Sequence, residues 1–503
     1  MQFMESLNKS EEVIFNHFYK LRHDHKRIII HSPVDNYGMP NRVEVNLSWI
    51  SKIHPIYGML FSFLSKPIRI SKLFKEIAYF LEITEEGAQN IITPFFNQTE
   101  PFSIEYGGET NLFPKNIIIN ASQSFSEPIF YSPKQFLYEK VDLKQERFYT
   151  APLSAVFMIN NTCVTNCVYC YADRSVKNKI LSFDRLKSLI ANARNLDMAT
   201  FFITGGEFFL YKEWKNLLDA LIKYGYKPGL ISTKMPLNED QVIAIKQYNI
   251  TIQISLDAIT DNILNKILKV KNGYAEKIKE SIILLEKHSV KFQIATVLTS
   301  YNDSISNLET IHKFLNNFKF IQRWELRLAF KSLYSRGNFD KFKVSKENIF
   351  ILDGWIQKIK LTTKLNIAWD ISGLDRYFKS NVGSKGFIGS RCSANYSNIV
   401  ILPDGKVTIC EQLYWNPQYI IGDLMTNSIE EVWNSPRALE LAFPKIEDFR
   451  DQSTCKHCNI FEECYSYANR CIVDVLKGYG EGNWDYPDPR CIKAPSFIHE
   501  LRN

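Results

Sequence analysis

The cysteines of this 503-residue chain fall into two groups that are separated by a long stretch without any. The first group comprises Cys163, Cys167 and Cys170, and no cysteine precedes it. The second group lies in the last quarter of the chain and comprises Cys392, Cys410, Cys455, Cys458, Cys464, Cys471 and Cys491. Cysteines that merely fill cores would be scattered. This distribution therefore indicates two metal-binding regions on a cysteine-free scaffold.

The sequence predicts a cytoplasmic location, where reduced cysteines are available to bind metal. The polar N-terminus lacks an apolar core of signal-peptide length, and the longest apolar runs, such as Tyr57–Leu64, are too short to span a membrane. We therefore expect a cytoplasmic protein without membrane contact, whose thiols stay reduced. The net charge of +7 is small for this length, and no dense Lys/Arg block concentrates it. Nucleic acid is therefore not an expected partner.

Residues 1–145 are predicted to form a winged-helix-like domain. A turn-rich stretch separates two predicted strands, and three predicted helices follow, the third of which has Thr84 as its N-cap. Two further extended segments could form a wing. The predicted elements are strands Arg27–His31 and Arg42–Leu47, helices Ile56–Leu64, Ser71–Leu81 and Glu85–Ile92, and wing strands Phe102–Tyr106 and Lys115–Asn120.

Residues 146–380 alternate between strand and helix patterns. Such alternation is typical of a parallel sheet, here a partial (β/α)6 TIM-like barrel with its site at the carboxyl ends of the strands. The predicted strands are Val156–Ile159, Thr200–Thr204, Gly229–Thr233, Thr251–Leu256, Lys291–Leu298 and Trp324–Phe330, and the predicted helices include Ser182–Leu196, Glu213–Tyr224 and Ala275–His288. Residues 381–503 are predicted to be a loop-rich iron–sulfur domain. The expected fold class is therefore α/β with a domain on either side of the barrel.

The first cysteine group has the spacing C-x3-C-x2-C in a loop that leaves a predicted strand. Three thiolates so close together can bind three irons of a cubane cluster, which leaves the fourth iron open to a small molecule. A zinc site with an outside fourth ligand is the alternative. Zinc sites usually pair two C-x2-C knuckles, and no second knuckle lies nearby.

This loop, with Tyr169 before its last cysteine, resembles the signature of the radical S-adenosylmethionine (SAM) superfamily. Gly205, Gly206 and Glu207 end the next predicted strand and match that family's GGE motif. The resemblance implies that this segment contacts the amino group of the methionine moiety of SAM. It also implies that the cluster cleaves SAM reductively to a 5′-deoxyadenosyl radical, and this radical abstracts a hydrogen atom from the substrate.

Other cofactor contacts are implied by their place in the family pattern. Ser255 and Asp257 resemble the ribose-contacting segment, although they could also simply cap a strand end. Asn302 and Arg327 resemble pocket positions, and Arg327 could bind the methionine carboxylate or form an ion pair within the barrel. The candidate acids or bases, chosen only for their place at or near strand ends, are Asp257, Glu325 and Asp370.

The second cysteine group resembles the SPASM domain, which carries auxiliary 4Fe–4S clusters in peptide-modifying radical enzymes. The resemblance implies one cluster on Cys455, Cys458, Cys464 and Cys491 and another on Cys392, Cys410 and Cys471. The family pattern would place a cysteine at Ala468, three residues before Cys471. Three fully ligated clusters of this kind would need about eleven thiolates, and the chain has ten cysteines. Either one auxiliary cluster has an open or non-cysteine ligand, or only one forms. Zinc sites of ribbon type are the alternative here.

The predicted N-terminal domain indicates what kind of substrate the protein acts on. A winged-helix-like module ahead of these two domains is similar to the leader-recognising element of peptide maturases that act on ribosomally made precursors. We therefore expect a peptide maturase that forms a thioether, a carbon–carbon cross-link or a related modification, with the precursor peptide and a flavodoxin or ferredoxin as partners. The alternatives are a sulfatase-maturase-like formylglycine-forming enzyme, which would lack the long N-terminal domain, and an iron–sulfur redox sensor that binds DNA.

Overall fold

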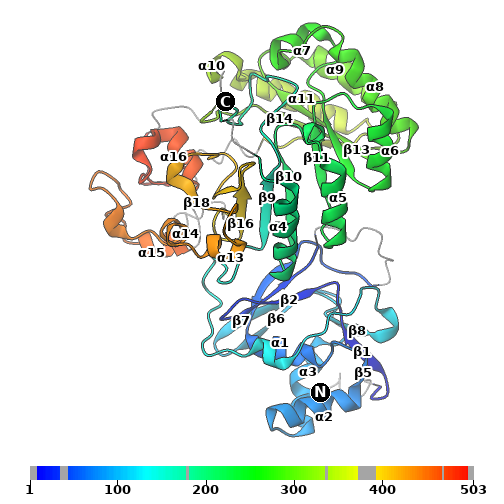
Figure 1. Ribbon diagram of the computed structural model, residues 1–503, viewed down its shortest axis with the longest axis vertical. Helices are drawn as coiled ribbons and strands as arrows, with labels where there is room; N and C mark the ends of the chain where they lie inside the picture. The colour runs from blue at the N-terminus through cyan, green and yellow to red at the C-terminus, as the bar shows by residue number, and fades with distance from the viewer. Residues whose placement is uncertain are drawn as a thin grey trace. The chain divides into compact units, whose positions relative to one another are not determined.

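The structure is a computed structural model that describes residues 8–33, 43–176, 180–334, 338–371, 392–466 and 470–496 (Figure 1). The chain divides into two compact units, Met1–Ala151 and Pro152–Asn503. The expected boundary between residues 380 and 381 lies outside the described residues.

The first unit combines small antiparallel sheets with three helices. One sheet has the order β5-β1-β8, a second has the order β2-β3-β4, and β6 and β7 form a hairpin. The strands are β1 (Glu12–Phe15), β2 (Lys20–His23), β3 (Ile28–His31), β4 (Ile50–Ile53), β5 (Ile68–Arg69), β6 (Phe102–Tyr106), β7 (Glu109–Phe113) and β8 (Ile118–Asn120). The helices are α1 (Pro55–Ser62), α2 (Ile70–Leu81) and α3 (Glu85–Ile92).

Aromatic side chains fill the core of this unit. Phe61, Phe95 and Phe113 are fully buried, and their rings meet edge to face, with centroids 5.0 Å apart for Phe61 and Phe95 and 4.9 Å apart for Phe95 and Phe113. This arrangement is favourable for aromatic pairs. Helix α3 begins as predicted, because the Thr84 hydroxyl accepts a hydrogen bond from the N–H of Gly87.

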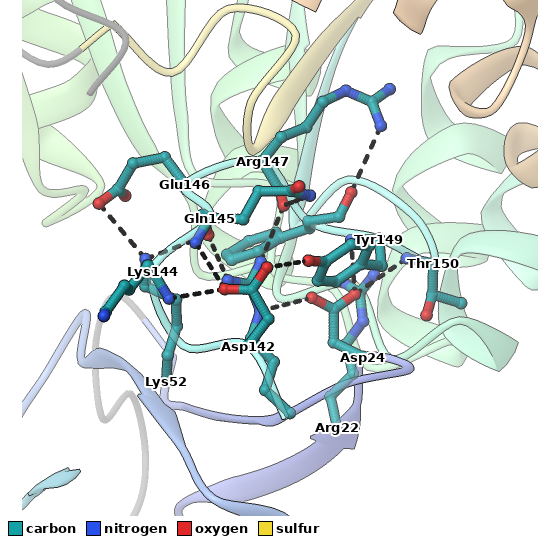
Figure 2. Close-up of polar contacts among 12 residues, drawn as sticks. Arg22, Asp24, Lys52, Asp142, Lys144, Gln145, Glu146, Arg147, Tyr149 and Thr150 are labelled. Atoms are coloured by element: carbon teal, nitrogen blue, oxygen red, sulfur yellow. Dashed lines mark hydrogen bonds and ion pairs between the residues drawn. The ribbon is translucent and has the colours of Figure 1, made fainter. Parts of the chain in front are cut away.

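A buried polar network fastens the last segment of this unit to the turn between β2 and β3 (Figure 2). The guanidinium of Arg27 donates to Asp24 Oδ2 at 2.9 Å, to the carbonyl of Arg147 at 2.8 Å and to the carbonyl of Gln145. The other oxygen of Asp24 accepts the N–H groups of Tyr149 and Thr150, both at 2.9 Å. We call residues 142–151 the strap. Arg27 and Asp24 are both fully buried, so each needs the other as a partner.

Two predictions for this unit were wrong. The described part of the predicted strand Arg42–Leu47, residues 43–47, is irregular, and the strand that follows it, Ile50–Ile53, pairs with β3. The wing pairs Phe102–Tyr106 with Glu109–Phe113, across a turn in which Gly107 and Gly108 both have positive φ. The predicted second wing strand, Lys115–Asn120, contains β8 (Ile118–Asn120), which pairs with β1 instead. Two glycines in left-handed conformations make a tighter hairpin than the one expected.

The second unit begins with the alternating strands and helices that were predicted. Strands β11 to β15 form a parallel sheet, and β9 and β10 pair in parallel in a second sheet. Its elements are β9 (Ser154–Met158), α4 (Phe183–Asn195), β10 (Thr200–Thr204), α5 (Trp214–Lys223), β11 (Leu230–Thr233), α6 (Glu239–Gln247), β12 (Thr251–Ser255), α7 (Asp261–Leu268), α8 (Tyr274–Lys287), β13 (Phe292–Leu298), α9 (Ile305–Leu315), β14 (Ile321–Leu328), α10 (Phe339–Phe342), α11 (Lys346–Lys360) and β15 (Ile367–Ala368). The barrel is therefore partial, with a break between β10 and β11.

The C-terminal part continues this second sheet. Strand β16 (Asn398–Ile401) pairs in parallel with β9, and β17 (Lys406–Thr408) and β18 (Ile420–Asp423) extend the sheet in antiparallel fashion (Figure 1). The free edge of the barrel at β9 is thereby covered. The remaining helices are short, namely α13 (Ile429–Trp433), α14 (Pro436–Ala442), α15 (Phe461–Ser466) and α16 (Ile472–Tyr479). None of the described helices has both the length and the apolar character needed to cross a membrane.

Candidate active site

A cavity of about 340 Å³ lies at the carboxyl ends of the barrel strands. That volume is within the usual range for small-molecule sites. Its wall comes from the cysteine loop and from every strand between β9 and β14. Of the predicted site residues, those that line it are Cys163, Cys167, Cys170, Tyr169, Gly205, Gly206, Ser255 and Arg327.

The cysteine loop is held against helix α7. The N–H groups of Asn166 and Val168 donate to the carbonyls of Leu268 and Ile267 at 2.8 and 2.9 Å. The Thr165 hydroxyl lies 3.4 Å from Cys163 Sγ and 3.2 Å from Cys167 Sγ. Burial raises the pKa of the Cys167 thiol to about 11. A metal that binds the Cys167 sulfur must therefore displace the thiol proton, so metal binding is coupled to proton release.

The two glycines after β10 let backbone approach backbone. The N–H of Gly206 donates to the carbonyl of Asn160 at 2.8 Å, and a Cβ at Gly206 would lie 2.1 Å from the carbonyl oxygen of Thr162. Gly205 has φ +150°, and a Cβ there would lie 2.9 Å from the carbonyl oxygen of Asn160. These glycines therefore allow the end of β10 to pack directly against the segment that leads into the cysteine loop.

Glu207 is buried behind the cavity wall and joins the two strands at the break in the barrel. Its carboxylate accepts hydrogen bonds from the Thr233 hydroxyl at 2.6 Å and from the N–H groups of Lys234, Met235 and Phe209 at 3.0, 3.2 and 3.5 Å. Burial raises the pKa of Glu207, although these four donors oppose the shift. The resemblance implied contact with an ammonium. The structure gives this carboxylate protein donors, and it does not line the cavity.

Asp257 and Asn302 also serve the protein scaffold. Asp257 is fully buried, and its Oδ2 accepts the Tyr169 hydroxyl at 2.5 Å while its Oδ1 accepts the N–H of Val297 at 2.8 Å. The side-chain amide of Asn302 donates to the carbonyls of Asp257 and Val297 at 2.9 and 3.0 Å. Neither residue lines the cavity. They tie the ends of β12 and β13 together instead.

One polar side chain in the cavity wall has an unused atom. Gln253 donates from Nε2 to the Ser232 hydroxyl at 2.9 Å, but its buried Oε1 has no partner among the described residues. A buried acceptor without a partner costs free energy, so a bound ligand with a hydroxyl or N–H group would be favoured there. Gln253 precedes Ser255 on the same side of β12 and was not predicted from the sequence.

Arg327 lines the cavity and is also paired within the barrel. Its guanidinium lies 2.8 Å from Glu325 Oε2, and this pair lowers the pKa of Glu325. Its side chain is half exposed, so it could still meet a second carboxylate. Glu325 and Asp370, two of the three candidate acids or bases, are not among the cavity-lining residues.

Three charged residues in the cavity wall, Arg174, Lys234 and Glu411, were not predicted from the sequence. Lys234 follows β11, and its Nζ donates to the Tyr169 hydroxyl at 3.0 Å. Glu411 comes from the C-terminal part, directly after Cys410, and burial raises the pKa of its carboxyl. Lys234 could have been predicted, because Thr233-Lys234-Met235 places a lysine at a strand end. Glu411 could not, because only the pairing of β16 with β9 brings it to the barrel.

Four of the C-terminal cysteines lie together. Cys455, Cys458, Cys464 and Cys491 line a common cavity, and burial followed by the other three thiols raises the pKa of Cys464 to about 12. Burial raises the pKa of Cys410 to about 12 and also raises the pKa of Cys471, and nearby Cys392 contributes to both shifts. Ala468 lies outside the described residues.

The residues present therefore fit iron–sulfur clusters and a small-molecule cofactor. Three thiols meet at the mouth of the barrel, the glycines leave no room for side chains beside them, and Gln253 offers an unpaired acceptor. In the C-terminal part, four described thiols line one cavity, and Cys392 lies near both Cys410 and Cys471.

Comparison with known proteins identifies the class. Residues 157–315 match the radical SAM superfamily, and residues 392–459 match SPASM, an iron–sulfur cluster-binding domain. The chain therefore contains a radical SAM domain and a SPASM domain.

Similar proteins extend the likeness beyond these two domains. The chain is 22% identical over 339 residues to the antilisterial bacteriocin subtilosin biosynthesis protein AlbA of Bacillus subtilis (strain 168), which covers 66% of this chain and 69% of AlbA. Its fold resembles Streptococcus suis SuiB bound to S-adenosylmethionine, with a TM-score of 0.61, 14% identity, and coverage of 95% of this chain and 100% of that one. SuiB bound to precursor peptide SuiA gives a TM-score of 0.60 with 15% identity and the same coverage.

Proposed function

We propose that this protein is a radical SAM maturase that modifies a ribosomally made precursor peptide, forming a thioether or carbon–carbon cross-link or a related modification. The observation that carries the proposal is the extent of the fold likeness. It spans 95% of this chain, including the N-terminal unit, and the whole of a protein whose structure was solved with its precursor peptide.

In this proposal, the cavity in the barrel starts the reaction. Cys163, Cys167 and Cys170 hold a 4Fe–4S cluster with one open iron. When bound there, the cluster and S-adenosylmethionine supply a carbon-centred radical that removes a hydrogen atom from the substrate. The backbone of Gly205 and Gly206 lets the cofactor lie close to the cysteine loop, and Gln253 and Ser255 offer acceptors for its hydroxyl groups. Arg327 supplies a cation for its carboxylate.

The C-terminal cysteines are proposed to hold auxiliary clusters. Cys455, Cys458, Cys464 and Cys491 supply four thiolates, which complete one 4Fe–4S cluster. Cys392, Cys410 and Cys471 supply three thiolates for a second cluster. Forming a cross-link removes two hydrogen atoms from the peptide. The 5′-deoxyadenosyl radical takes up one hydrogen atom. The other leaves as a proton and an electron, and an auxiliary cluster can accept the electron.

The N-terminal unit is proposed to bind the leader of the precursor. Its small antiparallel sheets have free edges to which an extended peptide can add as a strand. We place the enzyme in the cytoplasm, where a flavodoxin or ferredoxin can reduce the clusters.

Deleting residues 1–151 tests the role of this unit. The cut follows the strap, so that no strap residue is left without Arg27 and Asp24. We expect the shortened enzyme, purified without oxygen, to produce 5′-deoxyadenosine from SAM at the full-length rate. It should not cross-link a precursor encoded by a neighbouring gene, as read from the loss of two hydrogen atoms by mass spectrometry.

The full-length enzyme with the same peptide is the positive control. Continued cross-linking by the shortened chain would refute leader binding by the first unit. A full-length product that carries a formylglycine residue instead of a cross-link would refute the proposed reaction.

A further inference from the structure

Lys234 lies in the cavity wall in a position that three other residues fix. Its N–H donates to Glu207 Oε2 at 3.0 Å, and its carbonyl accepts the hydroxyl of Tyr274. Its ammonium donates to the hydroxyl of Tyr169 at 3.0 Å and lies 5.4 Å from the centre of the same ring. Contacts at both ends of the residue therefore determine where its charge lies.

Lys234 shares the cavity wall with the cysteine loop. It lines the same cavity as Cys163, Cys167 and Cys170. The Tyr169 hydroxyl accepts from Lys234 and donates to Asp257, so a phenol connects the ammonium to the carboxylate. Because Tyr169 directly precedes Cys170 in the chain, this hydrogen bond holds the ammonium beside the cysteine loop.

The other two basic residues in the cavity wall have different tasks. Arg327 is paired with Glu325 at 2.8 Å and is half exposed. Arg174 donates to the carbonyl of Thr165 at 2.6 Å and so supports the loop backbone. Lys234 differs because its hydrogen-bond partner is the neutral hydroxyl of Tyr169, and it lines the same cavity as all three cysteines of the loop.

We propose that Lys234 is a positioning residue that keeps a positive charge beside the cluster on Cys163, Cys167 and Cys170 and so makes that cluster easier to reduce. The proposal rests on the cysteine assignment in the proposed function, but it does not depend on the peptide substrate. The cluster gains one electron from a flavodoxin or ferredoxin, which loses one, and no bond or proton moves. Because reduction makes the cluster more negative, a nearby cation stabilises the reduced form more than the oxidised form.

Two neutral replacements separate charge from hydrogen bonding. Lys234→Gln keeps a donor that can reach toward Tyr169, whereas Lys234→Met removes both the charge and the donor. Lys234→Arg keeps the charge, and Lys223→Met removes an exposed lysine on α5 as a matched control. If one neutral variant fails to assemble its cluster, the other can still be titrated.

The measurement is a potentiometric titration of the full-length reconstituted enzyme without peptide, followed by EPR. The signal that changes when SAM is added reports the cluster in the barrel. Iron and sulfide contents establish first that each variant is loaded. We expect Lys234→Gln and Lys234→Met to lower the ratio of reduced to oxidised cluster at least tenfold at a fixed potential, which corresponds to a shift of about 59 mV. Lys234→Arg and Lys223→Met should match the wild type.

An unchanged potential in a neutral variant that carries its full iron would overturn the proposal. Weaker SAM binding by the same variant would then show that Lys234 contacts the cofactor and does not tune the cluster. Failure of the proposed function would look different, since the wild type itself would then show no SAM-responsive cluster signal.

Discussion

At the scale of single residues, Gly206 leaves no room for a Cβ atom, which would lie 2.1 Å from the carbonyl oxygen of Thr162, directly before the cysteine loop. A side chain at this position would overlap the carbonyl group of Thr162, and neither backbone can turn aside as a flexible side chain could. The sequence motif was visible, but the structure adds a steric reason for its second glycine. Glu207, by contrast, is held by four donors and joins two strands, which no motif could have revealed.

Replacing Gly206 with alanine should therefore disable the site. We expect about a tenfold or greater loss of SAM cleavage, because the loop that carries Cys163 must move away from its place. The amounts of 5′-deoxyadenosine and of iron per chain measure the effect. Gly354→Ala is the matched control, because no atom lies within 4 Å of the added carbon and the residue is inside helix α11. It should leave activity unchanged and stabilise the fold by at most about 1 kcal/mol. Normal activity in Gly206→Ala would contradict this steric account.

The strap offers a residue-scale test of acid sensitivity. Burial opposes ionisation of Asp142, but hydrogen bonds from the Tyr149 hydroxyl and from the N–H groups of Gln145 and Lys144 outweigh burial and lower its pKa. A carboxyl whose pKa is lower in the folded state stabilises that state above its unfolded pKa, near 3.8. Its contribution is then lost as the pH falls through the folded pKa.

We therefore expect the strap to loosen in acid. Hydrogen exchange corrected for intrinsic rates should show protection of residues 142–151 that falls below about pH 4 in the wild type. In Asp142→Asn the protection should already be reduced at pH 7, with little further change in acid. Arg27→Met is the stronger change, because it leaves buried Asp24 unpaired and should cost about 3–5 kcal/mol. Equal protection in wild type and Asp142→Asn at pH 7 would show that this carboxylate does not hold the strap.

At the scale of elements, local sequence pattern predicted most of the barrel because each strand and helix carries its own signal. Thr200–Thr204 and Glu85–Ile92 were predicted with the bounds that the structure has. One of the failures depends on a partner far along the chain. Ile118–Asn120 looked like a wing strand, but β1 offered it a partner more than a hundred residues earlier. The pairing of Asn398–Ile401 with β9 likewise has no local signature.

That pairing makes the barrel dependent on the C-terminal part. A chain ending at residue 371 lacks β16, so the edge of β9 would be exposed, and exposed strand edges promote aggregation. We expect this shortened chain to aggregate and to lose hydrogen-exchange protection in β9. A full-length variant that lacks Cys464 keeps β16 and should keep the barrel intact. A soluble shortened chain with a protected β9 would mean that the edge needs no cover.

At the scale of the whole molecule, the cysteines lie in separate places of the fold. The loop group lines the barrel cavity, and Cys455, Cys458, Cys464 and Cys491 line another cavity in the C-terminal part. Glu411, next to Cys410, lines the barrel cavity, so the segment that carries Cys410 reaches the same cavity as the cysteine loop. Because these groups of cysteines lie apart, replacing a ligand of one proposed cluster should leave the other clusters in place.

Each cluster should therefore be removable by itself. With three clusters loaded, we expect about 12 iron and 12 sulfide per chain. Cys170→Ala should lose about four irons and all SAM cleavage, while Cys464→Ala should lose about four irons, keep SAM cleavage and stop forming the peptide product. The two variants control for one another, because each keeps the cluster that the other lacks. Zinc in place of iron at the C-terminal cysteines, or loss of all iron from either single variant, would contradict independent clusters. Iron, zinc and sulfide analysis beside 5′-deoxyadenosine and peptide mass spectra distinguishes these results.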